Sequence, residues 1–177
     1  MNLVLALCNS APRRVFLVFV AVVAGLLLYG LYLQEVVGLV PCPMCIVQRY
    51  AMVLLAACAA VGAVSGRRGA HIFAGLGVVL CAAGGAFVAA RQSWLQWYPP
   101  EVASCGRDFY GMVENFPLQR AIPMIFRGSG DCTKVDWTFL GGSVANWSFV
   151  AFCALAAGAL LFVLARWRDD RQDDAVA

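Results

Sequence analysis

The chain has 177 residues, of which 62% are hydrophobic and 13% are charged, and its formal net charge is +3. A soluble globular domain has roughly 45–50% apolar and about 25% charged residues, so this composition excludes one. The charge is small and the arginines are scattered in pairs, which argues against a protein that binds nucleic acid. The sequence therefore predicts a membrane protein for which the lipid bilayer is a large part of the solvent.

Four apolar runs divide the chain, at 15–33, 46–64, 71–90 and 144–165. Each is close to the roughly 20 residues that a helix needs to cross about 30 Å of hydrocarbon. None shows the alternating polar pattern of a transmembrane β-strand, and their glycine and alanine residues allow helices to approach closely in lipid. We expect an all-α membrane protein, a four-transmembrane-helix bundle that forms a single integral membrane domain over residues 1–177.

Basic residues set the expected orientation of the bundle. They flank the first run, the connection between the second and third runs, and the end of the fourth run: Arg13, Arg14, Arg67, Arg68, Arg166, Arg168 and Arg171. The positive-inside rule makes these flanks cytoplasmic. Both termini, including the tail 166–177, are then cytoplasmic, while 34–45 and 91–143 form loops on the opposite, outer side of the membrane.

The eight cysteines divide by their predicted depth. Cys58, Cys81 and Cys153 lie inside apolar runs, where cysteine is most often a small packing residue, and Cys8 falls on the cytoplasmic side. The other four fall in the predicted outer loops: Cys42, Cys45, Cys105 and Cys132. An oxidising compartment on that side allows disulfide and redox chemistry.

Cys42 and Cys45 form a C-x-x-C motif where the first outer loop meets the second predicted helix. A dithiol at a helix N-terminus gains thiolate stabilisation from the helix dipole, which suits a redox-active pair. The same spacing is half of a zinc site, but the chain has no second C-x-x-C motif and only one histidine, His71. Ile46 after Cys45 excludes a C-x-x-C-H haem attachment site. We expect no metal here and an electron acceptor that is dissolved in lipid.

Arg49 lies four residues after Cys45, so both side chains stand on one helix face with Cβ atoms roughly 5–6 Å apart. A charge just inside a transmembrane helix is costly and usually functional, although an interfacial arginine can also snorkel to the headgroups. A cation at this place stabilises a thiolate and also the negative charge that develops on a quinone oxygen. Cys45, Arg49 and Gln48 therefore outline a site for a lipid-soluble two-electron acceptor.

Several stretches of sequence carry a resemblance to a known family. They are PCPMCIVQRY at 41–50, WLQWYP at 94–99, GSGDC at 128–132 and WTFLG at 137–141. Together with the four predicted helices, they make nearly the whole chain similar to the DsbB family, the disulfide bond formation proteins of the bacterial inner membrane.

The resemblance implies a thiol:quinone oxidoreductase that reoxidises the periplasmic dithiol oxidase DsbA, an activity that belongs to the known physiology of that family. Reduced DsbA would attack a Cys105–Cys132 disulfide at Cys105. Cys132 would then pair with Cys42, which leaves Cys45 as a thiolate beside ubiquinone or menaquinone. Reduction of the quinone restores the Cys42–Cys45 disulfide and passes the electrons to the membrane quinone pool.

Two features of the long outer loop complete the expected site. Gln92, just past the third run, would border the quinone headgroup together with Gln48 and Arg49. Residues 109–126 mix apolar and charged side chains, which indicates either a short helix lying on the membrane surface or an ordinary collapsed loop.

Two other classes of protein fit parts of the pattern. A quinone-linked enzyme of the vitamin K epoxide reductase type is also a small helical bundle with a C-x-x-C motif and loop cysteines, but there the motif belongs to a late helix. A non-enzymatic four-helix subunit would use a loop disulfide only as a structural staple. Bound quinone and thiol-dependent quinone reduction distinguish the enzymes from such a subunit.

Overall fold

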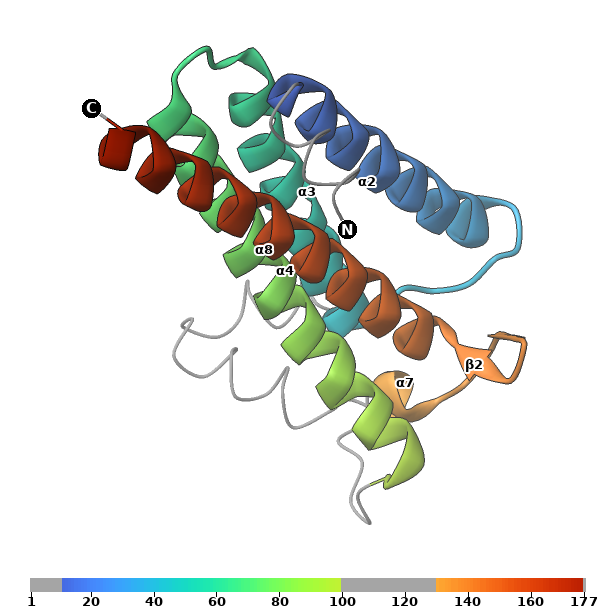
Figure 1. Cartoon of the computed structure of the whole chain (residues 1–177). Helices are drawn as coiled ribbons and strands as arrows, with labels where there is room; N and C mark the ends of the chain where they lie inside the picture. The colour runs from blue at the N-terminus through green and yellow to red at the C-terminus, as the bar shows by residue number, and fades with distance from the viewer. Residues whose placement is uncertain (1–10, 100–129, 177) are drawn as a thin grey trace, which may run out of the picture.

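The computed structural model describes residues 11–99 and 130–176. Four long helices lie side by side in it, and a short helix with a small hairpin covers one end of the bundle, which we call the hairpin end (Figure 1). The elements in chain order are α2 (Pro12–Glu35), α3 (Pro43–Val64), α4 (Arg68–Trp97), α7 (Gly130–Thr133), β1 (Thr138–Phe139), β2 (Gly142–Ser143) and α8 (Val144–Val176). Cys8, Cys105 and the predicted surface helix at 109–126 lie outside the described residues.

The four long helices confirm the predicted membrane fold. Each contains a segment long and apolar enough to cross a membrane: Pro12–Glu35, Pro43–Val64, Arg68–Trp97 and Val144–Arg168. Their outward faces expose large apolar side chains such as Leu28, Phe73 and Leu80. Such faces are stable only against hydrocarbon, so the exposed apolar surface is what a lipid-embedded bundle requires.

The helices begin and end beyond the predicted apolar runs. α3 begins at Pro43, ahead of the predicted start at 46, because proline suits the first helical turn and the Cys42 sulfur accepts a hydrogen bond from the Cys45 backbone amide. α4 continues to Trp97, so residues 91–97 are helical and not part of the predicted loop 91–143. The buried Gln92 and Ser93 show that this last part of α4 packs through polar side chains, which an apolar run does not detect.

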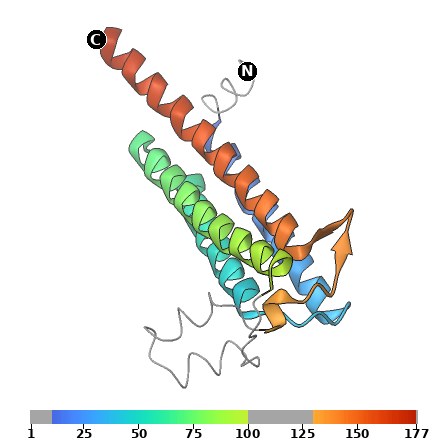
Figure 2. The same cartoon turned by 90° about the horizontal axis from the view of Figure 1, so that it is seen from below.

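The C-terminal helix is also longer than its apolar run. α8 continues to Val176, and Figure 2 shows it extending past the other helices at the end opposite the hairpin. The predicted tail 166–177 is therefore helical through residue 176. Charged residues form helices readily in water, so the apolar run measures the membrane crossing and not the length of the helix.

Small residues let α4 pack closely against its neighbours. α4 contacts both α3 and α8, while α2 packs mainly on α3. A Cβ atom added to Gly75 would lie 2.6 Å from a methyl group of Val163, and one added to Gly85 would overlap the ring of Phe152. The α4–α8 interface therefore depends on glycine at both places, as close helix packing in lipid requires.

The hairpin was not predicted from the sequence. In it, Thr138 pairs with Ser143 and Phe139 pairs with Gly142. The two turn residues, Leu140 and Gly141, have φ angles of 50° and 78°, which is the pattern of a type I′ turn. Leucine is an unusual residue at such an angle, so the usual Asn-Gly or Asp-Gly signal for this turn is missing from the sequence.

Candidate active site

The C-x-x-C motif lies at the N-terminus of α3, at the hairpin end of the bundle. Cys42 caps the helix, and its sulfur is 3.0 Å from the sulfur of Cys45. Both cysteines are unbonded thiols in the structure. A disulfide brings its sulfurs to about 2.05 Å, so a bond between these two would need only a small movement of the side chains.

The structure places Cys132 beside this pair. Cys132 lies in α7, is fully buried, and shares a small apolar cluster with Cys42, Met44, Val88 and Leu95. A hydrogen bond joins the Cys132 and Cys42 side chains. Three of the four outer cysteines predicted from the sequence therefore meet at one place, whereas the fourth, Cys105, is not among the described residues.

The surroundings of Cys42 keep its thiol protonated. Hydrogen bonds to Cys132 and Cys45, together with burial, raise the pKa of Cys42 well above its ordinary value. In the reduced dithiol, Cys42 therefore stays neutral at physiological pH. Cys42 is therefore held in the thiol form by its neighbours.

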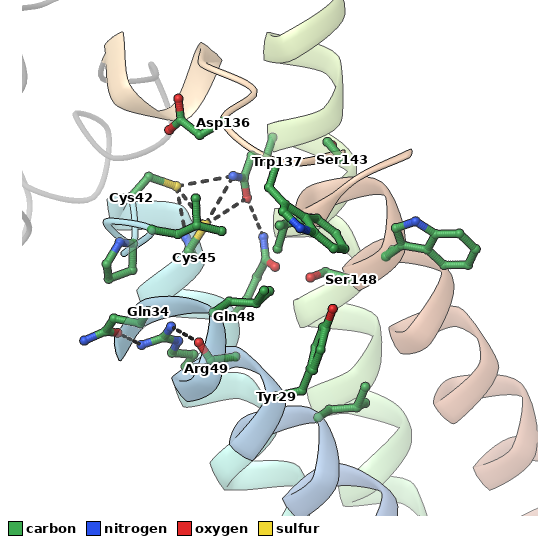
Figure 3. A pocket seen from close by; sticks show the side chains of 18 of the residues that line it. Tyr29, Gln34, Cys42, Cys45, Gln48, Arg49, Asp136, Trp137, Ser143 and Ser148 are labelled. Atoms are coloured by element: carbon green, nitrogen blue, oxygen red, sulfur yellow. Dashed lines mark hydrogen bonds between the residues drawn. The ribbon is translucent and has the colours of Figure 1, made fainter. Parts of the chain in front are cut away.

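An amide pair from two helices lies against the dithiol. Gln92 of α4 has its side-chain nitrogen 3.3 Å from the Cys42 sulfur and 3.3 Å from the Cys45 sulfur. Gln48 of α3 donates a hydrogen bond of 2.7 Å to the side-chain oxygen of Gln92. Both glutamines are 4% exposed. Figure 3 draws these hydrogen bonds as dashed lines that end at Cys42, Cys45 and Gln48.

Arg49 reaches from α3 to α2. Its guanidinium donates a hydrogen bond of 2.6 Å to Oε1 of Gln34 and one of 3.2 Å to the backbone oxygen of Gly30. Figure 3 shows Cys45, Gln48 and Arg49 along one helix, with Arg49 directed at Gln34. The cation is therefore held one helical turn from Cys45, as the i, i+4 spacing predicts, and α2 fixes its direction.

A cavity of about 510 Å³ lies below the dithiol. Cys45, Gln48, Arg49 and Gln92 line it together with apolar side chains such as Leu26. This volume falls within the roughly 300–1,000 Å³ typical of pockets for small molecules and cofactors.

The cavity separates α2 from α8 at the hairpin end. At the opposite end the two helices meet, because the ring of Phe16 packs edge-on against Phe162 with centroids 4.9 Å apart. Towards the hairpin end, Leu33 of α2 and Trp147 of α8 line opposite parts of the cavity. Both helices contribute apolar side chains to the lining of the cavity.

Sequence reasoning missed several residues of the site. Gln34, which holds Arg49, was only part of a predicted loop. Its place as a polar residue at the end of an apolar run is the signal that could have marked it as part of the site. Trp137 and Ser143 line the cavity because the unpredicted hairpin folds over it. No sequence pattern indicated that Gln92 would contact the sulfurs.

The described ranges contain no group of three or more histidine, cysteine, aspartate or glutamate side chains that could hold a metal ion. His71, the only histidine, lies near the start of α4, where its Nε2 is 3.0 Å from the backbone oxygen of Ser65. It is therefore at the opposite end of the bundle from the cysteines.

Fold and site together define a multi-pass membrane protein with a buried dithiol and a third cysteine at one end of a four-helix bundle, next to an apolar cavity. The family model described as disulfide bond formation protein DsbB matches residues 12–162. The chain belongs to the DsbB family, and it is a membrane oxidoreductase of disulfide bond formation. This finding confirms the resemblance deduced from the sequence and favours it over the vitamin K epoxide reductase type.

Individual relatives agree with the family match. The chain is 65% identical over 163 residues to disulfide bond formation protein B of Polaromonas naphthalenivorans, which covers 90% of this chain and 96% of the relative. It is 62% identical over 161 residues to the protein of the same name from Albidiferax ferrireducens, with 90% of each chain covered. The similarity therefore extends over nearly the full length of both proteins.

Proposed function

We propose that this protein is a thiol:quinone oxidoreductase of the bacterial inner membrane that reoxidises a periplasmic DsbA-type dithiol oxidase. The observation that carries the proposal is the meeting of Cys42, Cys45 and Cys132 beside a cavity that Cys42 and Cys45 line. Electrons would enter through one cysteine pair, pass to the second pair, and leave to ubiquinone or menaquinone from the membrane pool.

The entry step is the attack of a reduced DsbA-type protein on a Cys105–Cys132 disulfide. Cys132 is fully buried, so a thiolate on another protein cannot approach its sulfur. The attack is therefore assigned to Cys105, which forms the mixed disulfide while Cys132 leaves as a thiolate. The second thiol of the partner then releases its oxidised form and leaves Cys105 reduced.

The transfer step joins the two pairs. The Cys132 thiolate attacks Cys42 of the Cys42–Cys45 disulfide, so that a Cys42–Cys132 bond forms and Cys45 leaves as a thiolate. The hydrogen bond between the Cys132 and Cys42 side chains supports this step because the two sulfurs already lie together. When Cys105 later attacks Cys132, the first disulfide is restored and Cys42 is released as a thiol.

The exit step takes place at the cavity. A bound quinone would supply a two-electron, two-proton acceptor, and its reduction allows the Cys42–Cys45 disulfide to form again. Both sulfurs of the pair belong to residues that line the cavity, and Cys45 is the one that lies one helical turn from Arg49. The Arg49 cation favours the Cys45 thiolate before the transfer and negative charge on the acceptor oxygen during it.

A single-turnover experiment tests the proposed function. Purified protein is reduced, freed of reductant and mixed with a short-chain ubiquinone, and both quinol and remaining thiols are measured. We expect one quinol for every two thiols lost, no quinol from Cys45→Ser, and wild-type behaviour from Cys153→Ser, which changes an exposed cysteine of α8. A wild-type protein that binds no quinone and forms no quinol would instead support a non-enzymatic membrane subunit.

A further inference from the structure

The side-chain amide of Gln92 contacts both sulfurs of the active pair. Its nitrogen lies 3.3 Å from Cys42 Sγ and 3.3 Å from Cys45 Sγ. An amide nitrogen carries two hydrogens and no acceptor site, so towards these sulfurs it acts only as a donor. A donor at this place stabilises negative charge on sulfur, which exists only while the Cys42–Cys45 disulfide is open.

Gln48 determines which way the Gln92 amide points. The Gln48 nitrogen donates to Gln92 Oε1 at 2.7 Å, so the oxygen of Gln92 is held towards Gln48 and its nitrogen towards the sulfurs. Rotating the amide by half a turn would bring two NH₂ groups together and would turn the Gln92 oxygen towards the sulfurs. Because both glutamines are buried, an unpaired polar group in that arrangement could not form a hydrogen bond with water instead, so it would destabilise the fold.

The same amide also serves the protonated form of Cys45. Gln92 Oε1 lies 3.8 Å from the Cys45 sulfur, where it can accept a weak hydrogen bond from the thiol. The group therefore has an acceptor for the thiol and a donor for the thiolate without moving. Neither glutamine titrates, so this arrangement is the same at every physiological pH.

We propose that Gln92 is a catalytic residue, the fixed hydrogen-bond donor to the Cys45 thiolate that reduces the quinone, and that Gln48 is the positioning residue that holds it. This inference rests on the proposed function. It differs from the role expected from the sequence, in which Gln92 borders the quinone headgroup. An amide pair that only joined α3 to α4 would need the Gln48–Gln92 bond alone, whereas here the free NH₂ group is directed at both reacting sulfurs.

Variants of Gln92 and Gln48 distinguish two roles of the Gln92 amide, a hydrogen-bond donor to sulfur and a structural link between helices. Gln92→Glu keeps the length and shape of the side chain and still accepts from Gln48, but it replaces the donor with an oxygen. Gln92→Leu removes the amide, and Gln48→Leu leaves the amide without its support. Ser93→Ala, at the next position of α4, is the matched control, since Ser93 is buried but contacts neither sulfur and has no hydrogen-bond partner among the described residues.

Two measurements on the purified full-length variants test the inference. The first is the pH dependence of Cys45 alkylation in the reduced protein, located by mass spectrometry without quinone. The second is kcat and KM for a short-chain ubiquinone with a reduced DsbA-type donor. We expect Gln92→Leu to move the alkylation midpoint to higher pH and to lower kcat roughly ten- to a hundredfold, with the quinone KM within about twofold of wild type. Gln92→Glu should change the alkylation midpoint and kcat at least as much as Gln92→Leu. Gln48→Leu should change both by less, and Ser93→Ala should change neither.

Other outcomes would overturn the assignment. Wild-type alkylation midpoints and kcat in Gln92→Leu, which has no donor at this place, would make the amide pair a structural link only. A raised quinone KM with unchanged kcat would return Gln92 to the quinone headgroup. The alkylation midpoint is measured without quinone, so it tests the hydrogen bond from Gln92 to sulfur independently of the proposed function. If the wild-type protein failed to reduce quinone, the proposed function would be contradicted, and the alkylation midpoints would still decide the role of Gln92.

Discussion

Each sulfur of the active pair is held by side chains from elsewhere in the chain. Cys42 contacts Cys132, which is far along the sequence, and both Cys42 and Cys45 contact Gln92 of α4. In the proposed mechanism, these contacts keep Cys42 protonated and Cys45 carries the thiolate, and both residues line the cavity. One sulfur would then exchange with Cys132, and the other would react with the lipid-soluble acceptor.

Replacing Arg49 with glutamine tests the role of its charge. The structure shows the guanidinium tied to Gln34 and Gly30 of α2 while it lines the cavity. Arg49→Gln keeps hydrogen-bonding capacity but removes the cation, so we expect normal insertion into the membrane. The quinone affinity or the rate of quinone reduction should fall by roughly ten- to a hundredfold.

Arg49→Lys is the companion variant. A lysine keeps the charge but cannot reproduce the planar fork that binds Gln34 and Gly30 together, so its quinone kinetics should fall between those of Arg49→Gln and wild type. The measurement is the quinone KM and kcat of each purified variant, beside the amount inserted in membranes. Poor insertion with wild-type kinetics in the surviving protein would mean that Arg49 only anchors the helix.

Single cysteine changes test the division of labour between the two pairs. Cys105→Ala should block exchange with the DsbA-type donor yet leave the Cys42–Cys45 dithiol oxidisable by quinone. Cys45→Ala should abolish quinone turnover altogether. Thiol counts after mixing with donor or with quinone measure both effects, and equal tolerance of the two changes would contradict the relay.

Part of this site could be predicted from local sequence. The C-x-x-C spacing places both sulfurs in the first turn of α3, and the i, i+4 spacing places Arg49 one turn below Cys45, since both relations are fixed by helix geometry. The contacts of Gln92 with the sulfurs and of Gln34 with Arg49 join different helices. No local pattern encodes how two helices are rotated against each other, so these contacts required the structure.

At the scale of whole elements, glycine determines how closely α4 and α8 approach. A Cβ atom on Gly85 would overlap the Phe152 ring, whereas the neighbouring Gly84 has nothing within 4 Å of the same position. The two glycines therefore have opposite roles although they are adjacent in sequence. Gly85 lies in the interface, and Gly84 faces away from it.

This pair of glycines gives a matched stability prediction. Gly85→Ala should destabilise the bundle by about 1–3 kcal/mol, because Phe152 must leave its position to avoid the new methyl group. Gly84→Ala should be neutral or slightly stabilising, since alanine favours helix and meets no neighbour. Thermal unfolding of the purified variants in detergent measures the difference, and equal melting temperatures would contradict the packing described here.

The elements themselves differ in how well the sequence predicts them. Hydrophobicity locates the four membrane-crossing helices because lipid allows few alternatives. It does not find the last turns of α4, which pack through Gln92 and Ser93, or the extension of α8 to Val176. The hairpin also escapes prediction, since its turn uses Leu140 with a positive φ angle.

At the scale of the whole molecule, α2 and α8 are in contact at one end of the bundle, the closed end, and apart at the hairpin end, the open end. Phe16 and Phe162 join α2 to α8 at the closed end, while the cavity separates the same helices at the hairpin end. The dithiol, Cys132 and the cavity all lie at the open end. The proposed function requires this end to face the oxidising periplasm.

A topology experiment checks that requirement. A reporter that is active only in the periplasm should be active when fused after Asp108 and inactive when fused after Arg68 or at the C-terminus. The arginine residues near both ends of the chain and in the connection between α3 and α4 are the physical reason for this expectation. The reverse pattern would place the cysteines in a reducing compartment.

The central claim is that electrons pass from a dithiol protein through two cysteine pairs to a quinone. The most direct measurement mixes purified protein with a reduced DsbA-type donor and ubiquinone, and follows donor oxidation and quinol formation together. We predict one quinol for each donor disulfide formed, with coupled turnover lost in Cys132→Ala while direct oxidation of Cys42 and Cys45 by quinone continues. Donor oxidation without quinol, or full coupling in Cys132→Ala, would contradict the account.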